Sequence, residues 1–325
     1  MRLPDEITRK YEMFVERIAE RVYRRTSKRD LNLEVLRPAG SAGTPIPAVL
    51  WIHGGGWGWR GTYGGHRESM QIAVAARGYC AIGVEFRLST DAPFPAQIVD
   101  IRAAIDWIKQ HSGELEIDPE RIGVWGRSAG GHLAALIGVG LDFRASAQGA
   151  YGIEPGDFVV GTPEVQSVAS CFGPTDLSTI CESIDPERAQ HIRKISRPFF
   201  GGELEERKAL VDAANPLRYV DGGEPPFLFV HGRNDRTIPF SQAEILHNKL
   251  LESGCESTLL AVESAGHGLL PEPSGSTIDP PLEEVHRRIR AYFDRTLDHT
   301  PIPEVVEIEA KAEAEIETRT DGALK

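Results

Sequence analysis

The feature of this sequence that most constrains its fold is a regular alternation of short apolar runs with helix-like segments. The apolar runs are nearly continuous, as in strands that are buried on both faces of a parallel sheet. These runs lie at residues 48–52, 79–84, 121–125, 165–172, 226–230 and 258–262. Segments with helical periodicity lie between or after them, at residues 66–77, 96–111, 130–140, 241–253 and 281–297. This order predicts an α/β fold with a mostly parallel central sheet and helices on both faces.

Three further segments complete the expected organisation. Residues 7–22 carry apolar side chains at helical spacing and predict an amphipathic helix before the sheet. Residues 178–218 are polar and interrupt the alternation, which predicts a small cap-like insertion within a single domain over residues 1–299. Residues 300–325 are acidic and lack a stable apolar stripe, so we expect a mobile tail there.

Two pairs of side chains indicate a possible helix cap and a possible disulfide. Ser241 and Glu244 have the spacing of a capping box, which satisfies free amides at a helix start. Cys171 and Cys181 either form a disulfide or remain thiols, and we leave both alternatives open. No CxxC pair indicates a zinc or redox motif.

The net charge of the chain limits the kinds of partner that can be expected. The 325 residues carry a net charge of −12, whereas nucleic acids and anionic membranes attract basic faces. We therefore expect neither as a partner, and the oligomeric state stays open. No long apolar stretch or signal-peptide core is present, which favours a cytoplasmic protein. No HExxH motif or carboxylate cluster is present, so we expect no metal and no cofactor.

The motif GRSAG at residues 126–130 comes directly after the apolar run 121–125 and directly before a helix. A sharp turn from strand to helix strains the backbone of its central serine, here Ser128, and leaves room only for very small neighbours. The start of the helix adds a positive dipole end beside that serine. The motif therefore predicts an exposed, nucleophilic Ser128.

A serine nucleophile needs a general base, and the base needs an orienting acid. Asp235 follows the apolar run 226–230, and His267 follows the run 258–262 between two glycines. We therefore expect Asp235 to be the acid and His267 the base. His132 lies one helical turn after Ser128 and either reaches the site or packs in the core.

A second glycine-rich segment, HGGGW at residues 53–57, follows the apolar run 48–52. Glycines allow successive amides to point into one cavity. We expect Gly55, Gly56 and Ala129 to donate these amides to an oxyanion hole. The alternative, a phosphate-binding loop, would need a GxxxxGK[ST] or GxGxxG pattern, which this segment lacks.

Four side chains are expected to bind the substrate. Arg127 precedes the nucleophile, and Trp57 ends the glycine-rich segment. Trp57 is either an exposed ring that stacks on a substrate or a ring that packs this segment against the sheet. Phe199 and Phe200 either line an acyl pocket or anchor the insertion.

The motifs HGGGW, GRSAGGHLAAL, FGPTDL, HGRNDRTIP and SAGHG occur in this order. Together they resemble the α/β-hydrolase superfamily, most closely the esterase group that includes bifunctional feruloyl and acetylxylan esterases, with the hormone-sensitive-lipase-like esterases as neighbours. The resemblance covers about residues 30–297. It implies an α/β-hydrolase fold and the site roles given above. Arg127 stands where the hormone-sensitive-lipase-like pattern has an aspartate.

The resemblance and the motifs together predict a serine carboxylesterase. It would hydrolyse small acyl or aryl esters, of acetyl or feruloyl type, through an acyl-enzyme. The absence of a signal peptide favours small acyl esters or oligosaccharides over polymeric xylan as substrates. Two alternatives stay open: an amide-directed relative, such as an arylformamidase or a small serine peptidase, and a non-catalytic receptor on the same fold.

Overall fold

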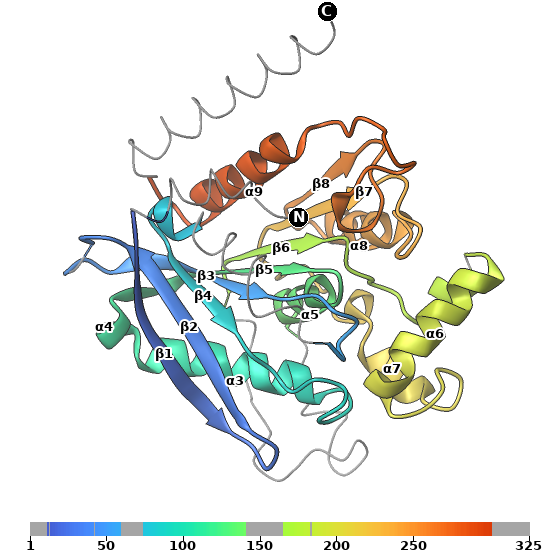
Figure 1. The fold of residues 1–325 in the computed structure, drawn as a ribbon, viewed down its shortest axis with the longest axis horizontal. Coiled ribbons are helices and arrows are strands. Elements are labelled where there is room, and N and C mark those ends of the chain that lie inside the picture. The colour runs from blue at the N-terminus through green and yellow to red at the C-terminus, as the bar shows by residue number, and fades with distance from the viewer. Residues whose placement is uncertain are drawn as a thin grey trace, which may run out of the picture.

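The computed structural model describes residues 12, 14–41, 43–59, 74–140, 165–182 and 184–300. Within these residues, eight strands form one sheet in the order β1-β2-β4-β3-β5-β6-β7-β8 (Figure 1). The strands are β1 (Val15–Arg25), β2 (Asp30–Pro38), β3 (Ile46–Ile52), β4 (Cys80–Val84), β5 (Ile117–Arg127), β6 (Ser167–Cys171), β7 (Phe227–Gly232) and β8 (Ser257–Val262). β2 is antiparallel to both β1 and β4, and the other pairs are parallel. The expected, mostly parallel sheet is confirmed.

The helices lie on both faces of this sheet and beside it (Figure 1). The α-helices are α3 (Ala96–Gln110), α4 (Ser112–Leu115), α5 (Ala129–Gly138), α6 (Pro186–Phe200), α7 (Lys208–Ala213), α8 (Ser241–Glu252) and α9 (Leu282–Thr296). Short 3-10 helices are η1 (Ile180–Glu182), η2 (Pro216–Arg218) and η3 (His267–Leu269).

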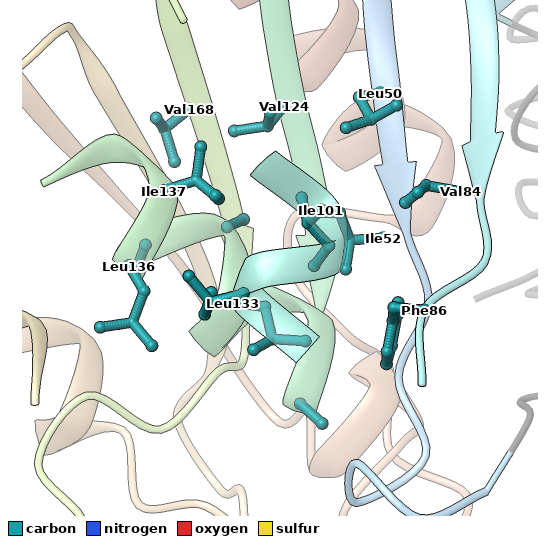
Figure 2. Close-up of a cluster of buried hydrophobic side chains, with 14 of the residues drawn as sticks. Leu50, Ile52, Val84, Phe86, Ile101, Val124, Leu133, Leu136, Ile137 and Val168 are labelled. Atoms are coloured by element: carbon teal, nitrogen blue, oxygen red, sulfur yellow. The ribbon is translucent and has the colours of Figure 1, made fainter. Parts of the chain in front are cut away.

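Two apolar layers hold the sheet between its helices. Along β3, Leu50 and Ile52 enter one layer, whereas Val49 and Trp51 enter the other. This alternation follows from the strand's two-residue side-chain period, and it explains why a strand buried on both faces is continuously apolar. The first layer contains side chains of α3, α5 and α8, and the second contains those of α9. Figure 2 shows the first layer, in which Leu133 and Ile137 of α5 and Ile101 of α3 lie against strand residues such as Ile52 and Val124.

The expected N-terminal helix is wrong where the structure describes it. β1 occupies Val15–Arg25 and pairs with β2 along its length. The pairing shifts register between Arg17 and Ala19 and again between Val22 and Arg24. Such bulges break the two-residue period of a strand. The apolar positions therefore imitate helical spacing, although the backbone is extended. The earlier part of the predicted helix, residues 7–11 and 13, lies outside the described residues.

Two local expectations also change. α8 is preceded by Phe240, which already has helical backbone angles, and no side chain caps the helix start. Ser241 is thus inside the first turn rather than before it, and the capping box is wrong. Cys171 and Cys181 are both free thiols, so the disulfide alternative is excluded. Cys171 instead lies within β6, where its sulfur accepts a hydrogen bond from the Trp125 indole.

The segment 178–218, expected as an insertion, contains η1, α6, α7 and η2. In Figure 1, α6 and α7 lie to one side of the layered body, beyond β6. The segment thus sits near the carboxyl ends of the parallel strands, the edge at which α/β sheets bind ligands. The expected tail, apart from Thr300, lies outside the described residues.

Candidate active site

Ser128 lies on a strained turn between β5 and α5. Its backbone angles are φ 51° and ψ −123°, a conformation that residues with a side chain rarely adopt. A Cβ on Gly126 would lie 2.0 Å from the carbonyl oxygen of Gly130, and a Cβ on Gly130 would lie 2.2 Å from that of Ile52. Both glycines are therefore required by close backbone approach, as the GRSAG motif predicted.

Ser128, His267 and Asp235 form a hydrogen-bonded series. The distance from Ser128 Oγ to His267 Nε2 is 3.0 Å, and that from His267 Nδ1 to Asp235 Oδ2 is 2.8 Å. A carboxylate only accepts hydrogen bonds, so Nδ1 carries the proton and Nε2 accepts from the serine hydroxyl. The structure thus brings together all three side chains that the motifs singled out, from the ends of β5, β7 and β8.

Asp235 is fixed by several donors. Its Oδ1 accepts from the amides of Thr237 at 2.8 Å and Ile238 at 2.9 Å. His231 Nε2 lies 3.3 Å from Oδ2 and also donates to the Ile238 carbonyl. Burial alone would raise the pKa of Asp235, but hydrogen bonds from His231 and His267 hold it well below its ordinary value. Asp235 is therefore ionised at neutral pH. His231 was not among the site residues expected from the sequence.

The glycine-rich segment after β3 lies beside Ser128. Gly55 has φ 119° and Gly56 has φ 56°, which glycine adopts without strain. Both residues line the same pocket as Ser128 and Ala129. Ala129 opens α5, and the first amides of a helix have no partner within it. The three expected oxyanion donors therefore border one cavity with the serine hydroxyl.

The pocket above Ser128 has a volume of about 610 Å³. Its walls come from the glycine-rich segment, the turn after β6, the loop after β7 and one face of α6. The α6 residues that line it are His191, Ile195 and Pro198. Their spacing of four and three residues places them on one helical face. That spacing is the sequence signal for this wall, although the expected acyl-pocket residues were Phe199 and Phe200.

Trp57 is not an exposed stacking platform. It is 2% exposed, its ring stacks on Phe199 at 4.4 Å, and its indole N–H donates to His132 Nδ1. The expectation of an exposed ring is wrong, and the packing alternative describes the structure. Trp59, two residues later, is 72% exposed and also lines the pocket.

Phe199 and Phe200 do not line this pocket. They are 0% and 1% exposed. Their rings lie 5.3 Å and 6.2 Å, respectively, from that of Phe94. The acyl-pocket expectation is wrong, because the helical face that carries these rings turns into the core. They anchor α6 instead.

His132 bridges the glycine-rich segment and the insertion. Its Nδ1 accepts from Trp57, and its Nε2 donates to the carbonyl of Ala214 at 2.7 Å. Burial lowers its pKa to about 4, although the bond to Ala214 acts in the opposite direction. His132 is thus a neutral packing residue rather than one that reaches Ser128. Arg127, the remaining residue expected to bind substrate, does border the pocket.

Comparison with known proteins places these observations in a family. The BD-FAE family model matches residues 33–250. Esterase LipC of Mycobacterium tuberculosis is 28% identical over 271 residues, 80% of this chain and 64% of that protein. Esterase LipQ of the same organism is 27% identical over 233 residues, 69% of this chain and 50% of that protein. The chain thus spans about half to two-thirds of the length of these relatives.

Solved structures share the fold. A carbohydrate esterase from gut microbiota superposes with a TM-score of 0.68 at 22% identity, over 87% of this chain and 96% of that chain. Esterase Est2 of Thermogutta terrifontis gives 0.65 at 23% identity, over 85% of this chain and 93% of that one. Among the described helices, none has the length and apolar character needed to cross a membrane. The α/β-hydrolase fold is confirmed, and because the family model spans well over half of the sequence, the chain belongs to the BD-FAE family.

Proposed function

We propose that this protein is a serine carboxylesterase that hydrolyses small acyl or aryl esters through an acyl-enzyme. The observation that carries the proposal is the hydrogen-bonded series from Ser128 through His267 to Asp235, opening into a pocket with glycine amides beside it. The names of the relatives LipC and LipQ, both esterases, support the reaction class.

In the first half of the reaction, His267 Nε2 accepts the hydroxyl proton as Ser128 Oγ attacks the ester carbonyl carbon. The carbonyl oxygen becomes an oxyanion, which the amides of Gly55, Gly56 and Ala129 stabilise. The intermediate then collapses: the bond to the alcohol oxygen breaks, and His267 returns its proton to the leaving alkoxide. The products are a free alcohol and an ester between the acyl group and Ser128.

In the second half, His267 removes a proton from a water molecule, whose oxygen attacks the acyl carbon. The tetrahedral intermediate collapses to a carboxylic acid, and Ser128 regains its proton from His267. Asp235 stays ionised throughout. It fixes the imidazole tautomer and stabilises the imidazolium that forms in both halves.

The lining of the pocket supports the proposal that the substrates carry small acyl or aryl groups. Ile195 and Pro198 of α6 limit its extent on one side, and the exposed ring of Trp59 offers an aromatic surface at its border. Related folds were solved with butyrate and propionate bound in Est2. We infer a preference for short acyl chains, with feruloyl-type esters accepted against Trp59.

A substrate panel tests this proposal. We expect the purified protein to hydrolyse p-nitrophenyl acetate and butyrate, and methyl ferulate, much faster than N-formylkynurenine or a peptide p-nitroanilide. Ser128→Ala should abolish the ester activity, whereas Ser274→Ala, an exposed serine outside the pocket, should retain it. Hydrolysis of N-formylkynurenine without ester hydrolysis would favour the amide-directed alternative. No turnover of any substrate would favour the receptor alternative.

A further inference from the structure

Arg127 is a charged side chain whose role the mechanism leaves open. It borders the pocket immediately before Ser128. Its Nη1 is buried and has no hydrogen-bond partner. The guanidinium carbon lies 5.9 Å from the centre of the Phe172 ring, and that ring lies 5.1 Å from the imidazole of His267. The cation and the imidazole of the general base thus lie beside the same aromatic ring.

The pocket around Arg127 offers it no negative charge. Among the described residues that line the cavity there is no aspartate or glutamate, although the whole chain has 48 acidic residues against 36 basic ones. The other titratable side chains of the lining are His191 and His267. The carboxylate of Asp235 lies behind His267, fully buried and already bonded to amides and the imidazole.

This environment is unfavourable for an unpaired guanidinium. Burial lowers the pKa of Arg127, with the nearby Cys171 acting in the opposite direction. An arginine nevertheless stays protonated in proteins, so its charge remains. A buried N–H without an acceptor loses its hydration and receives nothing in exchange. A carboxylate is the group whose shape and charge match a guanidinium best, since it accepts charge-assisted and often bidentate hydrogen bonds.

We propose that the pocket selects esters that also carry a free carboxylate, which Arg127 binds while Ser128 attacks the ester carbonyl. This inference rests on the proposed esterase function and specifies its substrate class. A carboxylate ester offers the guanidinium an anionic acceptor, which the described lining of the pocket lacks, whereas a neutral ester offers none. Sites with an unpaired polar group discriminate strongly against analogues that lack its partner.

The experiment measures kcat/KM for matched pairs of esters. In the first pair, monomethyl glutarate carries a carboxylate on the acyl side and methyl pentanoate does not. In the second pair, 4-acetoxybenzoate carries it on the alcohol side and 4-methylphenyl acetate does not. We expect the carboxylate ester to be preferred in one of the two pairs, by about tenfold or more, the size of a hydrogen bond to a charged group. The pair that shows the preference identifies the side of the ester that Arg127 faces.

Variants assign the preference to Arg127. Arg127→Gln should reduce the ratio of carboxylate to neutral ester by about tenfold or more, and Arg127→Lys should keep part of it. Arg25→Gln removes the same charge from β1 at the far edge of the sheet, where the side chain is 83% exposed, and should leave the ratio unchanged. Should Arg127→Gln fail to fold, the ratios of the wild-type protein and Arg127→Lys still decide the question.

Two results would overturn the inference. One is a wild-type protein that treats both members of each pair alike. The other is a preference that Arg127→Gln and Arg25→Gln change equally, since that would reflect net charge alone. Failure of the proposed function looks different, because no ester in either pair would then be hydrolysed in a manner that depends on Ser128.

Discussion

The pocket is built from two regions that are held in place by different means. At the carboxyl edge of the sheet, backbone geometry fixes the side chains: close glycine contacts force the turn at Ser128, and two amides hold Asp235. On α6, side-chain packing fixes them: Phe199 and Phe200 lie in the core, which leaves Ile195 half-buried at the cavity.

This difference assigns the proposed chemistry to the edge of the sheet and the proposed substrate selectivity to α6. A change at the sheet edge should alter the rate on every ester, because each substrate uses the same nucleophile, base and amides. A change on α6 should alter either the stability of the protein or the choice among substrates, depending on which face of the helix it touches. The following predictions test this separation.

The largest effect is expected at the sheet edge. Ser128→Ala should lower kcat on all p-nitrophenyl esters by about ten-thousandfold or more, as is typical when a serine nucleophile is removed. The melting temperature should stay close to that of the wild type. Alanine is smaller than serine, so it fits the strained turn at residue 128 without new contacts. Steady-state kinetics and calorimetry on the same preparation provide the check. A variant that keeps a tenth of the wild-type kcat would show that Ser128 is not the nucleophile.

The buried face of α6 should affect stability. Phe199→Ala removes a fully buried ring that stacks on Trp57, and we expect a loss of about 3–5 kcal/mol in the free energy of unfolding. Urea denaturation measures this loss. Ile195→Ala, on the pocket face of the same helix, is the control and should cost clearly less. Equal losses in the two variants would contradict the assignment of the two faces.

His132, which links the two regions, should make stability depend on pH. Its pKa is about 4 when folded and 6.5 in the absence of burial. Below pH 6.5 the unfolded chain therefore gains a proton that the folded protein resists. The stabilising contribution is complete above about pH 6.5 and is lost as the pH falls toward 4, by about 3 kcal/mol in total.

Urea denaturation between pH 7.5 and pH 4 measures this dependence. The wild-type protein should lose more stability over the range than His132→Gln, which lacks the titrating group. His286, whose pKa burial lowers to about 3, is present in both proteins and does not affect their difference. Parallel curves for the two proteins would show that His132 does not contribute.

The smallest effect is expected from the pocket face of α6. Ile195→Ala should widen the cavity and raise kcat/KM for p-nitrophenyl octanoate, relative to the acetate, by about tenfold or less. Hydrophobic pockets discriminate chain length by only a modest amount per methylene group. An unchanged ratio of octanoate to acetate would remove α6 from the selectivity of the pocket.

The parts that the sequence predicted are those in which local chemistry determines structure. The inner strands β3, β4, β6 and β7 are buried on both faces, so their apolar runs marked them directly. The turn at Ser128 depends on the adjacent Gly126 and Gly130, which are visible in the motif. Asp235 and His267 could be assigned because each follows an apolar run that forms a strand, β7 and β8 respectively.

The remaining features depend on contacts between distant segments. The sequence predicts a helix where β1 forms, because two bulges against β2 disguise the two-residue period of the strand. The orientation of α6 depends on how the insertion packs against Phe94 and Trp57, so Phe199 was assigned to the wrong face. The unpaired Nη1 of Arg127 emerges only from the assembled pocket.

The most direct test of the proposed chemistry is covalent labelling of the nucleophile. Esterase 2 of Thermogutta terrifontis was solved phosphorylated by paraoxon, which makes this reagent a suitable probe. Intact-mass and peptide mass spectrometry should find one diethylphosphoryl group per chain, on the peptide that contains Ser128. His267→Ala should react far more slowly, because its serine lacks the base. Labelling of another residue, or equal labelling of Ser128→Ala, would contradict the assignment of Ser128 as the nucleophile.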